Sequence, residues 1–160
     1  VKKQGERDNR ANYGDYPVKR AKLPDSVTEF LSHTTHEFHP ERFEISGDKL
    51  YYIPESFPTV RGLRILRCGL YVGEIKKNRF EPSQSLAMAL TKEEFDNCLD
   101  LPADDAKVIK YLKGETIDFD DASVKNGYVL VCVDGYPLGF GKANQGVLKN
   151  KYLPGWRLMS

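Results

Sequence analysis

The sequence predicts an α+β protein in which short helices are gathered in the middle of the chain and short antiparallel strands lie around them. Helical signals fall within residues 84–112, where apolar side chains recur at helical spacing or fill a short segment. Apolar runs separated by glycine-containing turns fall within residues 43–76 and 128–152, as expected of strands joined by tight connections. The length of 160 residues suits one ordinary domain or two small ones that share an interface.

The chain is expected to begin with a linker followed by a short helix. Residues 1–22 are polar, rich in Lys, Arg, Asn and Gly, and without periodicity, which indicates a flexible basic linker. Asp25 or Ser26 is expected to cap a helix that runs to about Thr34. The apolar side chains of this helix lie at helical spacing and are expected to face the core: Val27, Phe30 and Leu31.

Two strand pairs are expected next. Residues 43–45 and 50–53 flank the turn 46–48 and predict a hairpin. A second pair is expected at about 64–67 and 70–76, with glycines as bend or close-approach positions.

Three short helical segments are expected in the middle of the chain. Residues 84–90 are apolar nearly all round, which predicts a buried helix. Residues 91–94 (TKEE) fit a capping box. Asp104 or Asp105 is expected to start the third helix, which ends at Gly114. The core-facing side chains of this third helix are expected to be Val108, Ile109, Tyr111 and Leu112.

The C-terminal portion is predicted to be a β-meander. Strands are expected at 128–133, 136–142 and 147–152, separated by a turn at 134–135 and another at 144–146. Both alternating faces of the first of these strands are apolar, so we expect a central strand that is covered on both sides.

Composition and charge narrow the class of protein. The three cysteines are widely spaced and form neither a CxxC pair nor a metal-ligand spacing. We therefore expect no disulfide framework, and we expect the protein to be in the reducing cytoplasm. The net charge is only +1, but it is segregated: residues 61–81 carry six basic and two acidic side chains. Residues 91–121 carry ten acids against four lysines, and the last twenty residues carry four cations and no acid. Such a chain can present a basic face to a polyanion or simply solvated charged faces.

No motif predicts independent catalysis. The sequence contains no GxSxG, P-loop, HExxH or dinucleotide-binding glycine motif. The segment 139–142 (GFGK) resembles a phosphate loop only superficially, because it lies between strands and does not open a helix. The three histidines are spaced HxxHxxH and permit a metal site, but Pro40 interrupts any helix there, so an exposed polar helix end and loop is the preferred interpretation. They are His33, His36 and His39.

Two segments combine cations with aromatic rings. Residues 76–80 (KKNRF) and residues 149–157 (KNKYLPGWR) each bring several basic side chains beside an aromatic one. Cations neutralise phosphates and release counterions, while aromatic faces stack on unpaired bases. The pattern indicates nucleic-acid binding as one interpretation, but on composition alone buried aromatics and solvated lysines remain the preferred one.

The segment 62–83 (GLRILRCGLYVGEIKKNRFEPS) resembles the region that follows the catalytic domain in RsmF-like Nop/Sun RNA methyltransferases. The resemblance continues, in the same order, through LAMAL, YLKG, GYVLV, DGYPLG, GK and LKN at 86–90, 111–114, 127–131, 134–139, 141–142 and 148–150. The family tail usually reads NHYPKGLR, whereas residues 150–157 read NKYLPGWR, a departure that bears on the contacts of this tail.

The resemblance implies a small α/β subdomain at 23–82 and a PUA-like β pseudo-barrel with short helices at 83–160. In the family, an upstream domain transfers a methyl group from S-adenosylmethionine to C5 of a cytosine in ribosomal RNA, with cysteines in Pro-Cys and Thr-Cys contexts. The three cysteines here follow Arg, Asn and Val instead. We therefore expect no catalysis and no cofactor in this chain alone, with S-adenosylmethionine bound by a catalytic domain in cis.

The preferred hypothesis is a monomeric module that binds structured ribosomal RNA and positions it, without a membrane partner. A protein-interaction module that uses the acidic segment to dock a ribosomal protein or the catalytic domain is the alternative, and an independent enzyme is third. The expected RNA-binding residues are Lys76, Lys77, Asn78, Arg79, Gly135, Tyr136, Lys142, Lys149, Asn150, Lys151, Tyr152, Trp156 and Arg157.

Overall fold

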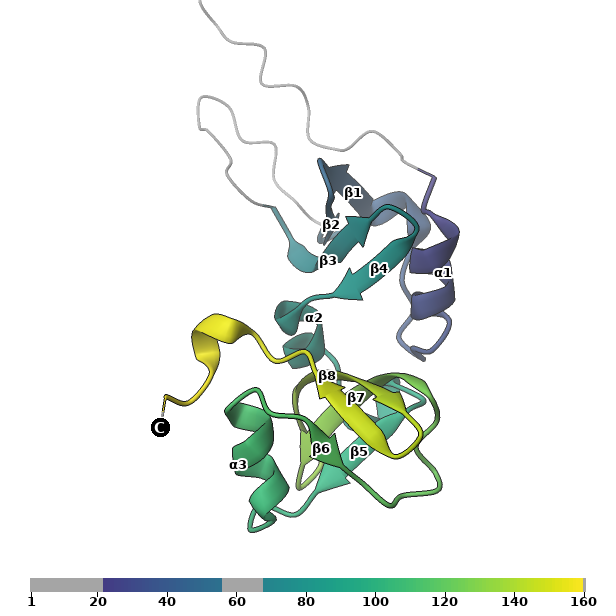
Figure 1. Cartoon of the computed structure of the whole chain (residues 1–160). Coiled ribbons are helices and arrows are strands. Elements are labelled where there is room, and N and C mark those ends of the chain that lie inside the picture. Colours follow the sequence, from purple (N-terminus) through teal and green to yellow (C-terminus); the bar gives the residue numbers. More distant parts are fainter. Residues whose placement is uncertain (1–21, 56–67, 160) are drawn as a thin grey trace, which may run out of the picture.

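The computed structural model describes residues 22–55 and 68–159 and contains two β-sheets with a short helix between them (Figure 1). The strand order is β1-β2-β3-β4 in the first sheet and β5-β7-β8-β9-β6 in the second. The predicted α+β class is confirmed. The predicted strand at 64–67 and residues 1–21 of the predicted linker lie outside the described residues.

The N-terminal part of the structure combines one helix with the four-stranded antiparallel sheet. The hairpin predicted at 43–53 is confirmed, and its turn includes Gly47 at φ 65°. The expected side-chain cap of the first helix is wrong: Pro24 occupies the N-cap position and Asp25 is already helical. The elements are α1 (Asp25–Leu31), η1 (Pro40–Arg42), β1 (Phe43–Ser46), β2 (Lys49–Tyr52), β3 (Leu70–Lys76) and β4 (Arg79–Pro82).

The middle segments are capped locally, as their sequences predict. They are α2 (Gln84–Ala89), η2 (Lys92–Glu94) and α3 (Ala106–Leu112). The Ser83 hydroxyl accepts from the Leu86 amide at 3.0 Å. Glu94 Oε2 accepts from the Thr91 amide at 2.8 Å and completes the capping box. These short segments are thus stabilised by side chains that satisfy their free backbone N–H groups.

Two expectations about helix burial are wrong. We expected α2 to be buried nearly all round, but Met88 is 50% exposed, because α2 packs mainly on β3 and β8 and leaves the side that carries Met88 facing solvent. Ile109 was expected in the core and is 49% exposed, whereas Val108 and Tyr111 on the same helix are buried.

The C-terminal part is built on the second sheet, in which β5 runs parallel to β7 and the other pairs are antiparallel. The predicted meander is confirmed as β7, β8 and β9. The short strands β5 and β6 were not predicted, since each is too short to show a clear alternation. The elements are β5 (Cys98–Leu101), β6 (Ile117–Asp118), β7 (Gly127–Val133), β8 (Tyr136–Asn144), β9 (Val147–Asn150) and η3 (Pro154–Trp156).

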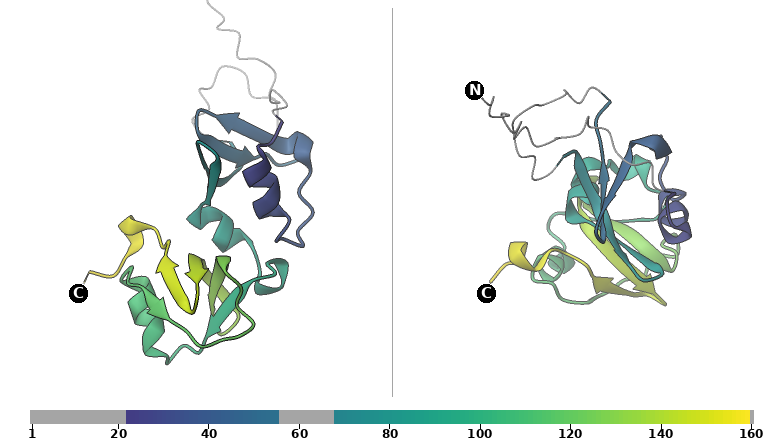
Figure 2. Two further views of the ribbon diagram at one scale, coloured as in Figure 1. Left: turned by 45° about the vertical axis from the view of Figure 1, so that its right-hand side comes forward. Right: turned by 90° about the horizontal axis from the view of Figure 1, so that it is seen from above.

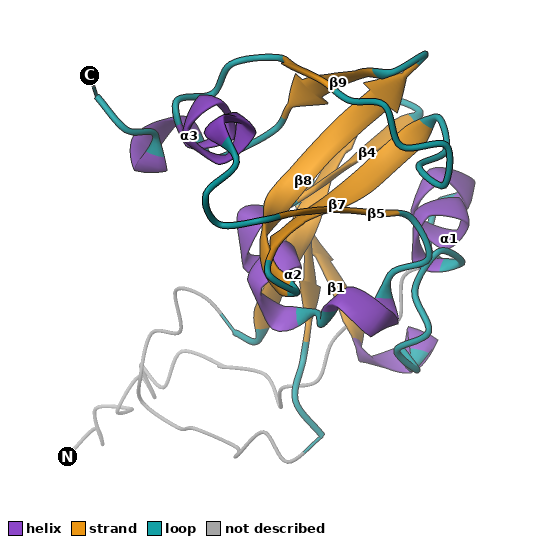
Figure 3. Cartoon of the chain, turned by 90° about the horizontal axis from the view of Figure 1, so that it is seen from below, coloured by secondary structure: helices purple, strands orange, loops and turns teal. Residues whose placement is uncertain are grey.

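Strand β7 is covered on both faces, as predicted. Val129 and Val131 belong to the core cluster that contains Tyr111 of α3, while Leu130 and Cys132 belong to the cluster that contains Phe30 of α1. In Figure 3 the strands of the second sheet lie between α3 on one side and α1 on the other. Alternate residues of one strand therefore bury apolar surface in two different cores.

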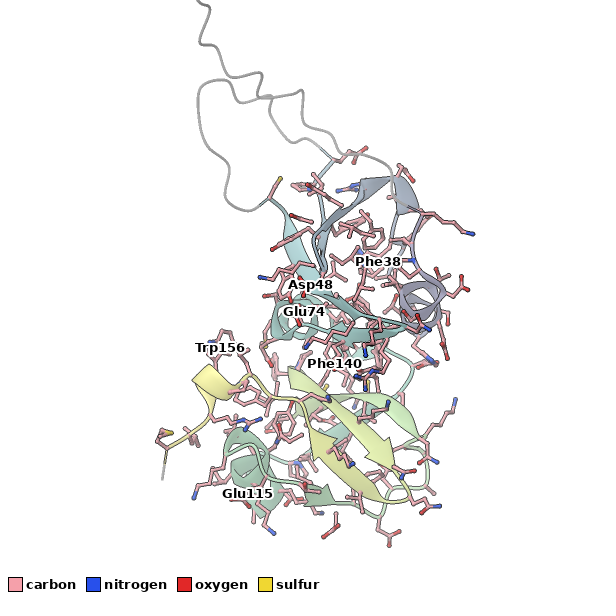
Figure 4. All side chains as sticks on the ribbon, turned by 45° about the horizontal axis from the view of Figure 1, so that its top comes forward. Phe38, Asp48, Glu74, Glu115, Phe140 and Trp156 are labelled. Carbon is pink, nitrogen blue, oxygen red and sulfur yellow. The ribbon has the colours of Figure 1, made fainter. Side chains whose placement is uncertain are left out.

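A cluster of aromatic rings joins the two parts. The ring of Phe30 lies 5.1 Å from Phe80, 5.6 Å from Phe95, 5.4 Å from Tyr128 and 5.6 Å from Phe140, measured between centroids. Figure 4 labels Phe140 at the junction of the two parts, and Figure 2 shows α1 and β4 above the second sheet. Such pairs at 4.5–7 Å stabilise a core beyond the area they bury. The two sheets are thus held by one shared core.

Candidate nucleic-acid interface

A groove of about 330 Å³ lies where the two parts of the molecule meet, and we call it the junction groove. It contains four of the side chains that the sequence predicted as RNA-binding: Asn78, Arg79, Lys142 and Lys151. Two come from the β3–β4 hairpin and two from β8 and the residue after β9. The other lining residues are Ser26, Glu29, Phe30, His33, Phe80, Glu81, Asn126, Gly127 and Tyr128.

The three cations of the junction groove have no acidic partner. Among residues 22–55 and 68–159, no carboxylate lies within 4.0 Å of the charged nitrogens of Arg79, Lys142 or Lys151. Unpaired cations need not break an internal ion pair before they neutralise a phosphate. The groove therefore suits an anionic partner.

Like charges also face one another beside the groove. Lys142 and Lys149 are direct partners on the antiparallel strands β8 and β9, so their side chains lie on the same face of the sheet. Cross-strand pairs of like charge are destabilising. A bound polyanion would remove this repulsion.

Lys76 and Lys77 lie at the rim of the β3–β4 hairpin and differ in their surroundings. Lys76 Nζ is 2.8 Å from Glu74 Oε2 and 3.2 Å from Glu81 Oε2, and its bonds to these carboxylates raise the pKa of the ammonium group. Lys77 adopts φ 55° in the turn and is exposed. Lys77 is thus free for an external contact, whereas Lys76 must first leave two carboxylates.

Sequence reasoning missed several residues of the groove, notably Ser26 and Tyr128. The Tyr128 hydroxyl donates to the Phe80 carbonyl at 3.0 Å, and Lys142 Nζ lies 5.6 Å from the ring centroid. Burial raises the pKa of Tyr128. Neither residue lies in a basic run, and only the packing of α1 against β4 and β7 brings them to the groove. Strand β4 was also missed, although its polar–apolar–polar order at 79–81 is a strand signal.

The predicted residues at the β7–β8 turn lie elsewhere. Tyr136 is 77% exposed and begins β8, six residues before Lys142, so the two are about 20 Å apart along the strand. The Gly135 amide donates to Asp100 Oδ1 at 2.9 Å. Burial opposes ionisation of Asp100, but this bond and the Lys92 ammonium hold the pKa of its carboxyl below the usual value.

Asn150 holds the C-terminal segment in place. Its Nδ2 donates to the carbonyls of Tyr111 at 2.7 Å and Glu115 at 3.0 Å, and its Oδ1 accepts from the Tyr152 amide at 2.7 Å. Both the oxygen and the nitrogen of the Asn150 side-chain amide thus make hydrogen bonds within the protein.

The C-terminal segment that follows β9 lies on the side of the molecule away from α1 (Figures 1 to 3). The Arg157 guanidinium donates to the Tyr152 carbonyl at 3.2 and 3.3 Å and fills the space that a side chain at Gly114 would need. The Tyr152 ring packs on Tyr111 with 5.4 Å between centroids. Trp156, labelled in Figure 4, remains 55% exposed.

The histidines take part in the connection between the two parts. His33 Nδ1 lies 3.1 Å from Asp96, and His36 Nδ1 lies 3.1 Å from Glu94 Oε1. Backbone bonds from Thr35 to Glu94 and from Asp96 to His33 accompany them. Two of the three residues in the HxxHxxH pattern are therefore paired with carboxylates of the segment around η2.

A second cavity, of about 570 Å³, adjoins α1 and has a different character. Leu31, Phe38 and Phe43 line it, and Lys22 is the one Lys or Arg among its lining residues. Its lining does not suit a polyanion.

The curled second sheet, with its short helices, defines a PUA-like domain, preceded by a small domain of mixed helices and strands. Two family models match successive parts of the chain. Residues 29–90 match the family model described as the RsmF rRNA methyltransferase first C-terminal domain, and residues 98–158 match the methyltransferase RsmF PUA domain. The chain belongs to the RsmF family and corresponds to its C-terminal domains.

Curated relatives carry the same family name. The ribosomal RNA small subunit methyltransferase F of Shewanella oneidensis is 30% identical over 115 residues, which cover 71% of this chain and 24% of the relative. The protein of the same name from Shewanella loihica is 31% identical over 104 residues, 64% of this chain and 21% of the relative. The matched region spans about a quarter of the length of these relatives.

Proposed function

We propose that this chain binds structured ribosomal RNA through the junction groove and positions it for a methyltransferase domain. The observation that carries the proposal is the convergence of Arg79, Lys142 and Lys151, from both parts of the molecule, without acidic partners among the described residues. Lys77, in the β3–β4 turn, and Lys149, opposite Lys142 on β9, extend this group. Phosphate contacts of this kind fix the orientation of a nucleic acid without reading its sequence.

The remaining predicted residues take smaller parts in the proposal. Tyr136 and Trp156 are exposed, and they contact the RNA only if it extends beyond the groove. Asn150, Tyr152 and Arg157 support the fold of the C-terminal segment and act on RNA indirectly. Asn78 lines the groove beside Arg79, whereas Lys76 and Gly135 lie at the rims of the two hairpins. The domain limits at 82/83 remain part of the proposal, since α2 packs on both β3 and β8.

The role in the whole protein follows from the family. The relatives are named as methyltransferases of small-subunit ribosomal RNA. We propose that the enzyme methylates C5 of a cytosine in that RNA, with S-adenosylmethionine bound by a catalytic domain in cis. The present chain then contributes binding and not chemistry, as a monomeric module in the cytoplasm. Among the described residues, no helix is both long and apolar enough to span a bilayer.

A titration of the chain with a ribosomal RNA hairpin and a DNA duplex of equal length, over a salt series, tests the proposal. If about four phosphates are contacted, affinity falls roughly a hundredfold between about 50 and 200 mM salt, and RNA is preferred. The double variant Lys142→Gln with Lys151→Gln should lower affinity about tenfold at low salt. It should also make the plot of log affinity against log salt less steep, by about 1.4 to 1.8 in slope, because two phosphate contacts are lost.

The matched control is Lys110→Gln on α3 with Lys113→Gln at its C-cap, which removes the same charge from exposed lysines outside the groove. This control should retain most of the affinity of the wild type. Equal losses in both variants would mean that net charge, rather than the groove, attracts the RNA.

A protein-interaction role for residues 91–121 is the alternative. The observation that bears on it is the internal pairing of this acidic segment: Glu94, Asp96, Asp100 and Asp105 each have a cationic or histidine partner. This pairing leaves less charge for a basic protein. No RNA binding at low salt, together with capture of the catalytic domain, would favour the alternative.

A further inference from the structure

The junction groove has the dimensions of a small-molecule site rather than of an open nucleic-acid track. Its volume of about 330 Å³ is near the lower end of the roughly 300–1,000 Å³ that ligand sites occupy. Its walls come from α1, the β3–β4 hairpin, β7 and β8, so it is bounded by both parts of the molecule. A paired helix cannot enter such a space, but one unstacked nucleotide can.

A buried hydroxyl in the groove lacks a partner. The Ser26 Oγ atom has no hydrogen-bond partner within the described part of the chain, although it is shielded from solvent. An unsatisfied buried polar group of this kind destabilises a protein by about 1–3 kcal/mol. A hydrogen-bonding ligand at the groove would satisfy it.

Amide groups approach the groove from both parts. Asn78 lies exposed in the β3–β4 turn, and within residues 22–55 and 68–159 its side chain makes no hydrogen bond. Asn126 accepts from the Gln145 amide at 2.9 Å through Oδ1, which leaves its NH₂ group to donate. Side-chain amides are the groups that pair with donor and acceptor edges of bases.

The charges in the groove favour one phosphodiester over a polyphosphate. Arg79, Lys142 and Lys151 are accompanied by the carboxylates of Glu29 and Glu81, and Glu81 is already bound to Lys76 at 3.2 Å. A planar guanidinium such as that of Arg79 also stacks on an unpaired base. The carboxylate of Glu29 would repel a ligand that carried several phosphates.

We propose that the junction groove accepts a single unpaired nucleotide of the bound RNA, whose base meets Asn78 and the Ser26 hydroxyl while its phosphate meets Lys142 and Lys151. This inference rests on the proposed RNA binding and adds that the RNA must expose an unstacked nucleotide at the groove. RNA recognition by splayed-out bases is common where helices offer no readable groove.

The test compares two RNA hairpins of equal length and charge, one with a single-nucleotide bulge and one fully paired. The full chain should bind the bulged hairpin about tenfold more tightly, which corresponds to about 1.4 kcal/mol. A 2-aminopurine placed at the bulge should change its fluorescence on binding. Asn78→Ala should reduce affinity for the bulged hairpin to that for the paired one, without changing the salt dependence of either.

Two further variants separate function from structure. Asn144→Ala, which removes an exposed amide at the end of β8 outside the groove, should leave both affinities unchanged. Ser26→Ala should keep or raise the stability of the free protein and weaken the preference for the bulge. Equal binding of both hairpins, with the expected salt dependence, would overturn this inference and leave the proposed function standing; no binding of either would overturn the proposed function itself.

Discussion

The junction groove and the C-terminal segment contain the same kinds of side chain and use them in opposite ways. Each has an asparagine and an arginine beside aromatic rings. In the groove, Asn78 and Arg79 make no side-chain hydrogen bond or ion pair within the described ranges. In the C-terminal segment, Asn150 makes three hydrogen bonds and Arg157 two, all to backbone atoms. Composition therefore does not distinguish a binding surface from an internal anchor, whereas the partners of each polar group do.

The largest effect is expected from Phe30→Ala, which removes the ring that joins the two parts. Truncation of a buried phenylalanine costs about 3–5 kcal/mol of unfolding free energy, and urea unfolding followed by the fluorescence of Trp156 measures it. RNA affinity should fall as well, because both walls of the groove pack on this ring. Phe38→Ala, whose partly buried ring packs on Phe43 and Tyr52, is the control and should spare RNA binding. A loss below about 1 kcal/mol for Phe30→Ala would contradict a shared core.

Asn150→Ala sharpens the comparison between the two asparagines. It leaves the carbonyls of Tyr111 and Glu115 and the Tyr152 amide without their partner, so we expect a loss of about 2–3 kcal/mol. Asn78→Ala should leave stability unchanged within about 0.5 kcal/mol. Urea denaturation measures both. If the Asn150→Ala variant were as stable as the wild type but bound RNA more weakly, Asn150 would contact RNA and would not hold the C-terminal segment in place.

The smallest effect is expected from Trp156→Ala. The ring is 55% exposed and meets Tyr152 only edge-on at 6.5 Å, so the loss of stability should stay below about 1 kcal/mol. Affinity for a short RNA hairpin should change less than about twofold, since a nucleotide in the junction groove does not reach η3. Filter binding of this variant beside Lys142→Gln with Lys151→Gln provides the comparison. If Trp156→Ala reduced RNA affinity more than that double variant, the RNA would bind at the C-terminal segment and not at the junction groove.

Local sequence signals predicted the elements that depend on neighbours along the chain. The caps at Thr91 and Asp105 form as their spacing predicts, because each bond joins residues two or three positions apart, and Ser83 caps α2 in the same way. The turns after β1, β7 and β8 are predicted for the same reason, since each requires a left-handed backbone at or near a glycine. The exposure of Met88 and Ile109 was not predicted, because it depends on which neighbouring strands each helix face meets.

The sequence by itself determined that this is an α+β chain with a C-terminal meander and two cation-rich segments, and it carried the resemblance to the RsmF family. Only the tertiary structure decided that Arg79 and Lys142, 63 positions apart, line one groove, while Asn150 and Arg157 bind backbone carbonyls. The reason is physical: periodicity and capping arise from contacts over a few residues, whereas the pairing of a polar group depends on packing between segments distant in the chain. Phe30, which holds those segments together, bears no sequence mark of this role beyond its place on an apolar helix face.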